Sequence, residues 1–479
     1  MEQRLQKLRR LREQGINPYP YRYERTHLSS DILGRFEELR GSPVRIAGRL
    51  MTMRVMGKAS FAHLLDQSGK MQLYVRRDLV GEEQYALFKS LDLGDFVGVT
   101  GKPFLTRTGE ITVEAGEVVL LSKALRGLPE KWHGLTDTET RYRQRYLDLI
   151  SNEESRKVFQ IRSRTIDGIR RFLVDRGFLE VETPILQPIH GGAAARPFVT
   201  HHNALDRDLY LRIALELYLK RCVIGGIERV FEIGRIFRNE GISTKHNPEF
   251  TMMEVYQAYA DYHDIMVLLE EMISTVAMQV LGTTEIEYNG NTIDLKAPWP
   301  RLSLRQAIMD ESGVDYDLYP TAEGLYEAVR ALGLRPEPGA SRAKLIDVLL
   351  SEYVEPRLVQ PTFLLDYPVE MSPLAKRKRD DDAVVERFEA FIGGMEVANA
   401  FSELNDPLDQ RQRFEQQMAD KAAGDEETQP MDEDFLTALE HGMPPTGGLG
   451  LGLDRLVMLL TGNPSIREVI LFPQLRTRE

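Results

Sequence analysis

Five short segments between residues 43 and 125 limit the fold more than any other feature of the sequence. Each segment is rich in apolar and β-branched residues, and turn-forming stretches such as QSGK and RTGE separate neighbouring segments. The segments read PVRIAGRLMTMRV, SFAHLLD, KMQLYVRRD, DFVGVTGKPF and ITVEAGEVVLL. Strands of this kind fit a small barrel of the OB type, whose exposed face commonly holds single-stranded nucleic acid. Residues 43–125 are therefore predicted to form an OB-fold domain.

One face of this predicted barrel carries side chains suited to contact bases. Because side chains alternate along a strand, Gln72 and Tyr74 share the polar face of KMQLYV, and Phe61 and His63 share one face of the preceding segment. An aromatic ring on an open sheet can stack on a base, which contributes about 1–3 kcal/mol per base. The same rings can equally belong to the barrel core, so both interpretations stay open at this point.

The remainder of the chain divides into segments of different character, since 479 residues are too many for a single core. Residues 1–42 begin with an amphipathic basic helix, which either packs on its own domain or binds RNA. Residues 126–154 resemble a connector, with Pro and Gly first and a polar helix after them. In residues 155–479 helices and strands mix without a regular βαβ rhythm, and residues 300–360 read as a helical insertion. The predicted fold class is α+β: a barrel, then a mostly antiparallel sheet with flanking helices.

Charge, apolar runs and cysteine usage narrow the function classes. Residues 1–150 contain 25 Lys and Arg against 19 Asp and Glu, whereas the remaining residues contain 36 against 54. A basic front on an acidic body suggests a nucleic-acid partner, with a chance distribution of surface charge as the alternative. No apolar run approaches the ~18 residues of a membrane span, and the charged N-terminus lacks the apolar centre of a signal peptide. The single Cys222 fits a reducing compartment, so we expect a cytoplasmic protein without a membrane segment.

Two neighbouring segments, VFEIGRIFRNE and FTMMEVY, bring charged side chains to one surface if they pair as antiparallel strands. Alternation gives the shared face carboxylates, an arginine and two aromatic rings. The residues on this face are Glu232, Arg238, Glu240, Phe250, Met252, Glu254 and Tyr256. Charged groups that face inward are costly unless they have a ligand or a partner. The two segments therefore mark either a binding site or a salt-bridged network.

A third segment, FEAFIGGMEVANAFSELND, places two glutamates close together. Gly393 and Gly394 are suited to a two-residue hairpin turn, which would pair Glu389 with Ala398 and bring Glu396 to the same face as Glu389. Two close carboxylates repel each other unless a proton or a cation lies between them, and oxygen ligands suit Mg²⁺.

The same hairpin carries three further candidates, Asn399, Phe401 and Glu403. Simple alternation puts these side chains on the face opposite to Glu389. They reach the same pocket only if a bulge or a strong twist occurs near Ala398. The sequence therefore predicts an irregular hairpin if all these residues share one site.

The glycine-rich segment GGLGLGLDRLVMLL (447–460) is a poor match to a dinucleotide fingerprint. Its glycines alternate along a strand, and Leu453 stands where the third glycine of the fingerprint would be. The chain contains no GxxxxGK[ST], which excludes a P-loop. We interpret the segment as a strand that enters a helix, with Asp454 near the cap and Arg455 in the first turn, where a phosphate can bind.

Taken together, these segments resemble a known family. GFLEVETPIL (177–186), FRNE…HNPEF (237–250) and GLGLGLDR (448–455) are similar to motifs one, two and three of the class II aminoacyl-tRNA synthetases. The stretches GGAAARPFVTHHNALD, LELYLKR, FTMMEVYQAYADYHD, SPLAK and NAFSELND resemble lysyl-tRNA synthetases of the bacterial type. The similarity runs almost from end to end. It implies ATP-dependent activation of L-lysine to lysyl-adenylate and transfer of lysine to the 3′ end of tRNA(Lys).

The resemblance also implies which residues bind ATP. Arg238 matches the motif-two arginine that bridges the substrate carboxylate and the α-phosphate, and Arg455 matches the motif-three arginine on the γ-phosphate. Both are therefore the candidate catalytic residues. Glu240 and Phe250 match the residues that hold adenine, and His246 lies in the loop over the nucleotide.

Metal and lysine ligands follow from the same resemblance. Glu389 and Glu396 match the magnesium ligands, for more than one ion in each subunit. The residues that match lysine ligands are Gly192, Glu216, Arg238, Glu254, Tyr256, Asn399, Phe401 and Glu403. A buried carboxylate that meets the ε-ammonium would reject neutral amino acids by about 10⁴-fold or more, because it would be left unpaired.

The barrel and motif one imply two macromolecular partners. The barrel of this family reads the anticodon, with Arg54, Phe61, His63 and Gln72 as the candidate residues for stacking and edge contacts. Motif one forms a dimer interface around Pro184, which implies a homodimer.

Alternatives differ in the charge of the substrate or in the partner. Aspartyl and asparaginyl synthetases share the subclass but would place a cation in the side-chain pocket, whereas Glu254 and Glu403 are anions. Relatives that attach lysine to a protein usually lack the barrel, and a non-enzymatic RNA-binding paralogue would tolerate loss of the motif arginines. The chain departs from the family pattern where Leu215 replaces a common Pro and where Ala398 and Ala400 replace common glycines.

Overall fold

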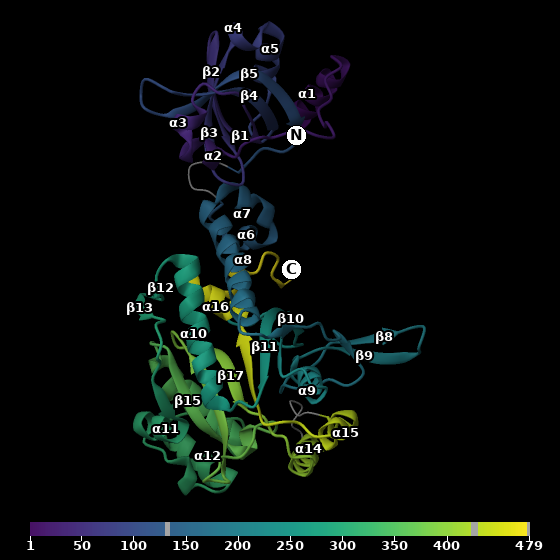
Figure 1. Ribbon diagram of the computed structural model, residues 1–479, viewed down its shortest axis with the longest axis vertical. Coiled ribbons are helices and arrows are strands. Elements are labelled where there is room, and N and C mark those ends of the chain that lie inside the picture. Colours follow the sequence, from purple (N-terminus) through teal and green to yellow (C-terminus); the bar gives the residue numbers. More distant parts are fainter. Residues whose placement is uncertain (130–134, 423–429, 477–479) are drawn as a thin grey trace. The chain divides into compact units, whose positions relative to one another are not determined.

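The computed structural model describes residues 1–129, 135–422 and 430–476, and its chain divides into two compact units between Thr136 and Asp137 (Figure 1). The expected connector, residues 126–154, is therefore split between the units. Its second part forms two short helices, α6 (Thr138–Arg143) and α7 (Arg145–Ser151). Among the described residues, none of the helices combines the length and the apolar character needed to cross a bilayer.

The N-terminal unit contains a closed five-stranded barrel in the order β1-β2-β3-β5-β4, which confirms the predicted OB-type fold. Its strands are β1 (Val44–Met56), β2 (Ala59–Leu65), β3 (Lys70–Arg76), β4 (Phe96–Leu105) and β5 (Ile111–Ser122). Two helices that the sequence analysis did not anticipate, α4 (Arg77–Val80) and α5 (Glu82–Ser90), connect β3 to β4. Their side chains Tyr85 and Phe88 are buried in the barrel core.

The N-terminal segment packs on the barrel of its own unit. Helix α1 (Glu2–Glu13) buries Leu8 and Leu11, and Leu11 belongs to the barrel core. Arg4 Nη1 donates to the carbonyl oxygens of Ala124 (3.1 Å) and Arg126 (2.9 Å) at the end of β5. Two further helices, α2 (Ser29–Gly34) and α3 (Phe36–Leu39), precede β1. The sequence left two roles open for α1, packing on its own domain or binding RNA, and these contacts show packing.

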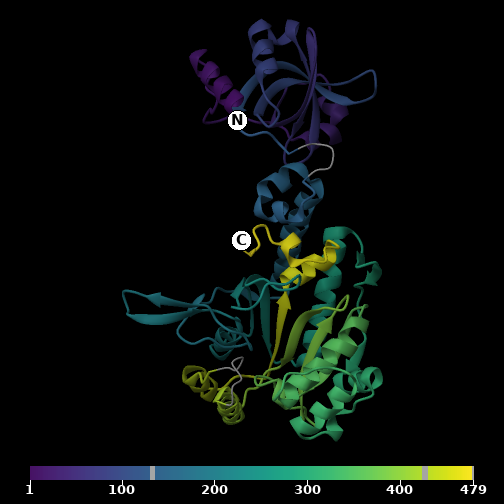
Figure 2. The same ribbon diagram turned by 180° about the vertical axis from the view of Figure 1, so that it is seen from behind.

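The second unit is built on an eight-stranded sheet in the order β14-β15-β16-β17-β18-β11-β10-β6. Only the two outermost pairs, β14–β15 and β10–β6, are parallel, which confirms the mostly antiparallel sheet. Figure 2 shows β18, in yellow, running through the middle of the sheet. The strands are β6 (Leu179–Glu180), β10 (Arg229–Phe237), β11 (Glu249–Ala258), β14 (Arg301–Ser303), β15 (Thr362–Pro368), β16 (Val384–Phe391), β17 (Glu396–Ser402) and β18 (Thr446–Gly452).

Helices cover the sheet and extend it. The long helices α8 (Glu153–Val174) and α10 (Tyr262–Leu281) share one buried core with α16 (Leu453–Leu460), α17 (Ile466–Val469) and the sheet (Figure 1). Residues 300–360 contain α11 (Leu304–Ser312), α12 (Ala322–Ala331) and α13 (Arg342–Leu349), which form a second core against β15 and β16. A third core joins α9 (Glu216–Ile224), α14 (Pro407–Ala422) and α15 (Glu433–Glu440) to β10 and β11.

Two smaller sheets complete the second unit. The first has the order β7-β9-β8 and consists of β7 (Leu186–Gln187), β8 (Val199–His202) and β9 (Arg207–Leu211). The second is a hairpin of β12 (Glu285–Tyr288) and β13 (Asn291–Asp294).

Candidate active site

The paired strands β10 and β11 carry the first group of candidate residues. Their antiparallel register places Glu232 opposite Glu254, so the two glutamates share one face as predicted. Glu232 accepts hydrogen bonds from the amide and the hydroxyl of Thr183, and its Oε1 lies 2.5 Å from Arg212 Nη1. The ion pair with Arg212 thus neutralises the charge of Glu232. For this residue the salt-bridged alternative holds.

Arg238 follows the end of β10, at the start of a loop that returns at Pro248. The Arg238 amide donates to the Pro248 carbonyl (2.8 Å), which closes the neck of the loop. The guanidinium lies 5.3 Å from the centre of the Phe250 ring, and Nε donates to the Ile213 carbonyl at 3.4 Å. Within the described residues Arg238 forms no ion pair with a carboxylate, so its charge is available to an anionic ligand.

The loop after Arg238 brings an imidazole to the same place. His246 Nδ1 lies 2.8 Å from Ser243 Oγ, and His246 Nε2 lies 3.5 Å from Arg455 Nη2. Burial lowers the pKa of His246, and the charges of Arg455 and Arg238 lower it further. Glu240 is exposed in this loop, where it acts on Arg238 through its charge. The loop therefore places the His246 imidazole next to Arg455 and within reach of the charge of Arg238.

The hairpin of β16 and β17 contains a bulge. The sequence predicts such an irregularity if Glu389 and Asn399 are to share one site. Its two turn glycines have φ of 63° and 71°, which confirms the predicted turn. The register shifts next to the turn, so that Val397 is an extra residue and Glu389 lies opposite Asn399. The predicted pairing of Glu389 with Ala398 is therefore wrong, since it assumed a regular ladder. The bulge near Ala398 is confirmed, and it turns Asn399 to the face of Glu389.

Two carboxylates of this hairpin lie in a charged environment. Glu389 accepts hydrogen bonds from the Tyr367 hydroxyl (2.8 Å) and from Arg387 Nη2 (2.5 Å), and Glu396 Oε2 lies 2.9 Å from Arg455 Nη1. Burial raises the pKa of Glu389 to about 7, with Arg387 opposing and Glu396 adding to the shift. Burial alone would also raise the pKa of Glu396, but Arg455 brings it below its usual value.

These two carboxylates fit a magnesium ion that is held in part by a ligand. Within the described residues no group of three or more His, Cys, Asp or Glu side chains is arranged to hold a metal. Mg²⁺ commonly takes one or two carboxylates from the protein and completes its shell with water and substrate phosphates. The donor set of Glu389 and Glu396 is of this kind, and the mutual repulsion that helps raise the pKa of Glu389 is relieved by a cation.

Strand β18 and helix α16 position the second arginine. Asp454 Oδ2 accepts a hydrogen bond from the Thr251 amide (2.6 Å), and Asp454 Oδ1 lies 2.5 Å from Arg162 Nη1. These contacts fix the start of α16 against β11 and α8. Arg455, the next residue, extends away from this anchor toward Glu396 and His246.

Three glutamates from separate parts of the chain meet in a buried cluster, which is called the acidic pocket below. Glu216 begins α9, Glu254 lies in β11 and Glu403 follows β17, and their relative exposures are 6%, 3% and 1%. Lys220 Nζ lies 2.6 Å from Glu216 Oε1 and also forms an ion pair with Glu403. The Tyr256 hydroxyl donates to Glu254 Oε2 at 3.0 Å.

Burial disfavours the ionised form of these carboxylates. It raises the pKa of Glu254 to about 7, and the charge of Glu216 adds to this shift. Burial also raises the pKa of Glu216 and of Glu403, although Lys220 acts in the opposite direction on both. A carboxylate with a raised pKa gains stability from any further cation that enters its surroundings. The pocket therefore favours a cationic ligand.

Two glycines allow the chain to pack closely against these glutamates. A Cβ atom at Gly448 would lie 1.9 Å from Glu403 Oε1 and 2.6 Å from the Tyr256 ring. A Cβ atom at Gly192, which has a φ of +87°, would lie 3.1 Å from Glu216 Cβ. A side chain at either position would therefore displace the glutamate that lies against it.

Asn399 and Phe401 face the same region. Arg387 Nε donates to Asn399 Oδ1 (3.0 Å), and the Phe401 ring centre lies 5.4 Å from Lys220 Nζ. The bulge thus brings Glu389, Asn399 and Phe401 to one side of the sheet.

The departures from the family pattern have separate effects. Ala398 and Ala400 are 2% and 1% exposed and lie in the core shared with α8 and α10, so their methyl groups point away from the pocket. The Leu215 amide donates to Glu254 Oε1 at 2.8 Å. A proline at this position would have no N–H to make this bond.

The candidate base readers lie on adjacent strands of the barrel. Their register places Arg54 opposite Phe61 and His63 opposite Gln72. The Phe61 ring stacks on Tyr74 with centres 4.6 Å apart, and both rings lie outside the buried barrel core. Phe61 and Tyr74 are thus surface aromatics, and the core interpretation does not apply to them.

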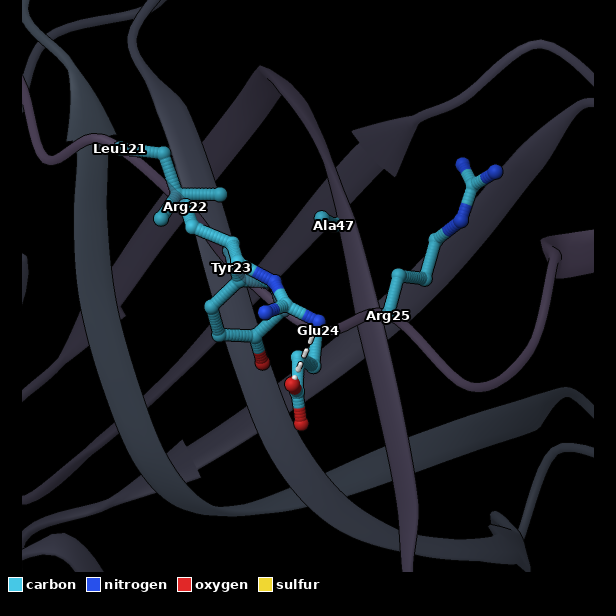
Figure 3. Close-up of a pocket in the computed structure, with 6 residues that line it drawn as sticks. All are labelled: Arg22, Tyr23, Glu24, Arg25, Ala47 and Leu121. Carbon is cyan, nitrogen blue, oxygen red and sulfur yellow. Dashed lines mark ion pairs between the residues drawn. The ribbon is translucent and has the colours of Figure 1, made fainter.

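The barrel also has a surface pocket of about 540 Å³ that is separate from these four residues (Figure 3). Arg22 and Glu24 in this pocket form an ion pair at 2.7 Å, and Arg25 points away from both in Figure 3. Its lining contains two arginines and one glutamate, none of them among the candidate residues, and we assign it no part in the site. Its lining residues are Arg22, Tyr23, Glu24, Arg25, Ala47 and Leu121.

Two residues that contact the candidates were not singled out from the sequence. Lys220 pairs with two pocket glutamates, and Arg387 contacts Glu389 and Asn399. Spacing could have indicated each of them, because Lys220 lies four residues after Glu216 on a helix and Arg387 lies two before Glu389 on a strand.

Comparison with known proteins gives matches along the whole chain. A family model described as tRNA synthetases class II (D, K and N) matches residues 137–476, and one described as an OB-fold nucleic acid binding domain matches residues 44–121. The lysine–tRNA ligase of Moorella thermoacetica is 62% identical over 479 residues, with 100% of this chain and 98% of the relative covered. The corresponding enzyme of Pelotomaculum thermopropionicum is 59% identical, with 100% and 95% covered, and that of Carboxydothermus hydrogenoformans 58%, with 99% and 98% covered.

Proposed function

The chain belongs to the lysine–tRNA ligases of the class II tRNA synthetase family, and from this membership we propose how its residues divide the work of the reaction. The enzyme uses ATP to activate L-lysine as lysyl-adenylate and transfers lysine to the 3′ end of tRNA(Lys). The observation that carries the lysine assignment is the acidic pocket, in which burial raises the pKa of three glutamates.

Lysine binds with its cationic groups in the acidic pocket in this proposal. Glu403, with Glu254 and Tyr256, receives the ε-ammonium, while Glu216 and the Gly192 backbone receive the α-ammonium. Phe401 packs along the aliphatic stem. A buried carboxylate left without a cation is costly, so neutral amino acids of similar length are rejected.

ATP binds between the two motif arginines. The adenine stacks on Phe250 with its amino edge toward Glu240, and His246 covers the nucleotide. Arg238, with Asn399, holds the lysine carboxylate and extends to the α-phosphate. Arg455 exchanges its contact with Glu396 for the γ-phosphate, because the phosphate carries more charge.

The chemistry requires two anions to approach each other, since the lysine carboxylate oxygen attacks the α-phosphorus as pyrophosphate leaves. Arg238 lowers the repulsion between these anions and stabilises the charge that develops at phosphorus. Magnesium ions, when bound by Glu389 and Glu396, would supply charge neutralisation for the departing pyrophosphate. No side chain acts as a nucleophile, so positioning and electrostatics account for the rate.

The surface aromatics of the barrel support anticodon binding. Phe61 and Tyr74 offer a stacked platform, with Arg54, His63 and Gln72 beside it. Replacing Phe61 by alanine is expected to raise the KM for tRNA in aminoacylation about 5- to 100-fold, because one stacking contact of about 1–3 kcal/mol is lost. Lysine-dependent pyrophosphate exchange, which needs no tRNA, should not change. An equal loss of aminoacylation and of pyrophosphate exchange would contradict the assignment of Phe61 to anticodon binding.

A homodimer in the cytoplasm completes the proposal. Apolar side chains on both sides of Pro184 are exposed in the single chain, at 52% for Leu179, 45% for Ile185, 46% for Leu186 and 38% for Ile189. Exposed apolar side chains grouped in this way fit a surface that another subunit covers. A cytoplasmic location agrees with a substrate that serves translation.

The experiment that tests the function is ATP–pyrophosphate exchange with each of the twenty amino acids. We expect exchange with lysine and none above background with aspartate or asparagine, whose anionic or neutral side chains find carboxylates rather than a cation. Exchange with aspartate instead of lysine would favour the neighbouring synthetases. Exchange with lysine but transfer to a protein rather than to tRNA would favour the protein-modifying ligases.

A further inference from the structure

Lys220 is a buried cation that the reaction described above does not use. It lies in α9, one turn after Glu216, and its side chain exposes 0% of its surface. Its Nζ lies 2.6 Å from Glu216 Oε1 and also forms an ion pair with Glu403. The proposed function assigns these two glutamates to opposite ends of the substrate. One ammonium group thus bridges the two carboxylates that bind the α- and the ε-ammonium of lysine.

The groups around Lys220 can be counted by charge. Glu216 from α9, Glu254 from β11 and Glu403 after β17 supply three carboxylates, and Tyr256 is neutral because burial raises its pKa well above the ordinary value. Arg387 acts on Glu216 through its charge but is paired with Glu389 at 2.5 Å, so this pair adds no net charge. The rings of Phe401 and Phe435 also lie near Lys220, with their centres 5.4 and 6.0 Å from its Nζ.

We propose that Lys220 is a specificity-determining residue that favours the ionised forms of Glu216 and Glu403 and thereby sets at two the number of further positive charges that the pocket accepts. This inference rests on the proposed assignment of the lysine pocket. With all three carboxylates ionised, the one internal ammonium leaves two negative charges, which match the α- and ε-ammonium groups of the substrate. The lysine carboxylate lies outside this count, because Arg238 binds it.

Without Lys220 a proton would take its place. Burial acts to lower the pKa of the Lys220 ammonium, but Glu216 and Glu403 raise it above the ordinary value, so the residue is charged. If Lys220 is removed, the pKa of Glu216 and Glu403 rises further, because the cation that favours their ionised form is gone. A carboxyl group that retains its proton is neutral. Lysine then has to displace this proton before it can bind.

The test is the pH dependence of the lysine KM in Lys220→Met, measured by pyrophosphate exchange. Below the raised pKa the pocket is protonated and the lysine KM is high, and the KM falls as the pH rises through that value. We expect the rise of KM on acidification to begin about one pH unit or more higher in the variant than in the unmodified enzyme, with the lysine KM about 10-fold higher at pH 7. The KM for ATP and kcat should change less than about 2-fold.

Controls separate this role from a structural one. Lys157→Met removes an exposed lysine that pairs with Glu154 at 2.8 Å on a helix, and it should leave the lysine KM unchanged at every pH. Lys220→Gln, which retains hydrogen-bond donors without the charge, replaces the methionine variant if that variant does not fold. An unshifted KM profile in the folded variant, or equal losses for lysine and ATP, would overturn the proposal. Failure of the proposed function is distinct, because then the unmodified enzyme itself shows no lysine-dependent exchange.

Discussion

Replacing Arg238 by alanine is expected to lower the rate of lysine-dependent pyrophosphate exchange by about 100- to 1,000-fold or more. Loss of one preorganised donor at a developing negative charge costs about 2.7–4 kcal/mol in comparable sites. Arg238 is suited to this role because, within the described residues, it is not neutralised by a carboxylate and lies beside the Phe250 ring. The variant is measured in the exchange assay with saturating lysine and ATP, since the loss is expected in kcat.

An arginine three residues earlier in the chain provides the control. Arg235 is exposed on β10, and its carbonyl oxygen accepts a hydrogen bond from Arg212, a contact that a change of the Arg235 side chain leaves in place. Arg235→Ala should therefore keep the exchange rate within about 2-fold, as expected for a surface substitution. If Arg238→Ala kept the same rate as Arg235→Ala, Arg238 would have no part in activation, and a binding module would become the better description of this domain.

Replacing Glu403 by glutamine is expected to raise the KM for lysine by about 30- to 5,000-fold and to leave the KM for ATP unchanged. Loss of one partner from a buried, hydrogen-bonded charge pair costs about 2–5 kcal/mol. Glu403 is 1% exposed and burial raises its pKa, so nearby cations such as Lys220 favour its ionised form. In the proposed function the ε-ammonium of lysine is a further such cation. The measurement is the exchange rate over a range of lysine concentrations at fixed ATP.

The matched control for this variant is Glu440→Gln at the exposed end of α15. It makes the same chemical change outside the pocket and should leave both KM values as they are. If Glu403→Gln raised the KM for ATP as much as the KM for lysine, Glu403 would support the whole site instead of selecting the amino acid.

The two sheets could be predicted from the sequence because local patterns determine them. The five barrel strands have clear alternation and turns, and β10, β11 and β18 contain the motifs around which the second sheet is built. Helices α4 and α5 were missed, since a short amphipathic stretch between strands gives a weak periodic signal. The position of Val397 as an extra residue could be inferred only from the requirement that Asn399 and Glu389 face the same pocket.

The site could be predicted only in part, for a related reason. Arg238, Glu254, Glu389 and Arg455 carry charges within recognisable motifs, so their grouping could be anticipated. The bridging position of Lys220 depends on α9 packing against the end of β17, residues 220 and 403 being far apart in the chain. Likewise, Glu232 is neutralised by Arg212, a contact between separate segments that no pattern within one strand can indicate.

A crystal structure with lysine and a non-hydrolysable ATP analogue tests the central claim most directly. That claim is that three buried carboxylates select a doubly cationic amino acid while one guanidinium brings its carboxylate to the α-phosphate. The predicted result is the ε-ammonium within hydrogen-bond distance of Glu403, with Arg238 in contact with both the lysine carboxylate and the α-phosphate. A lysine bound with its ε-ammonium outside the pocket of Glu216, Glu254 and Glu403, or a nucleotide remote from Arg238, would contradict it.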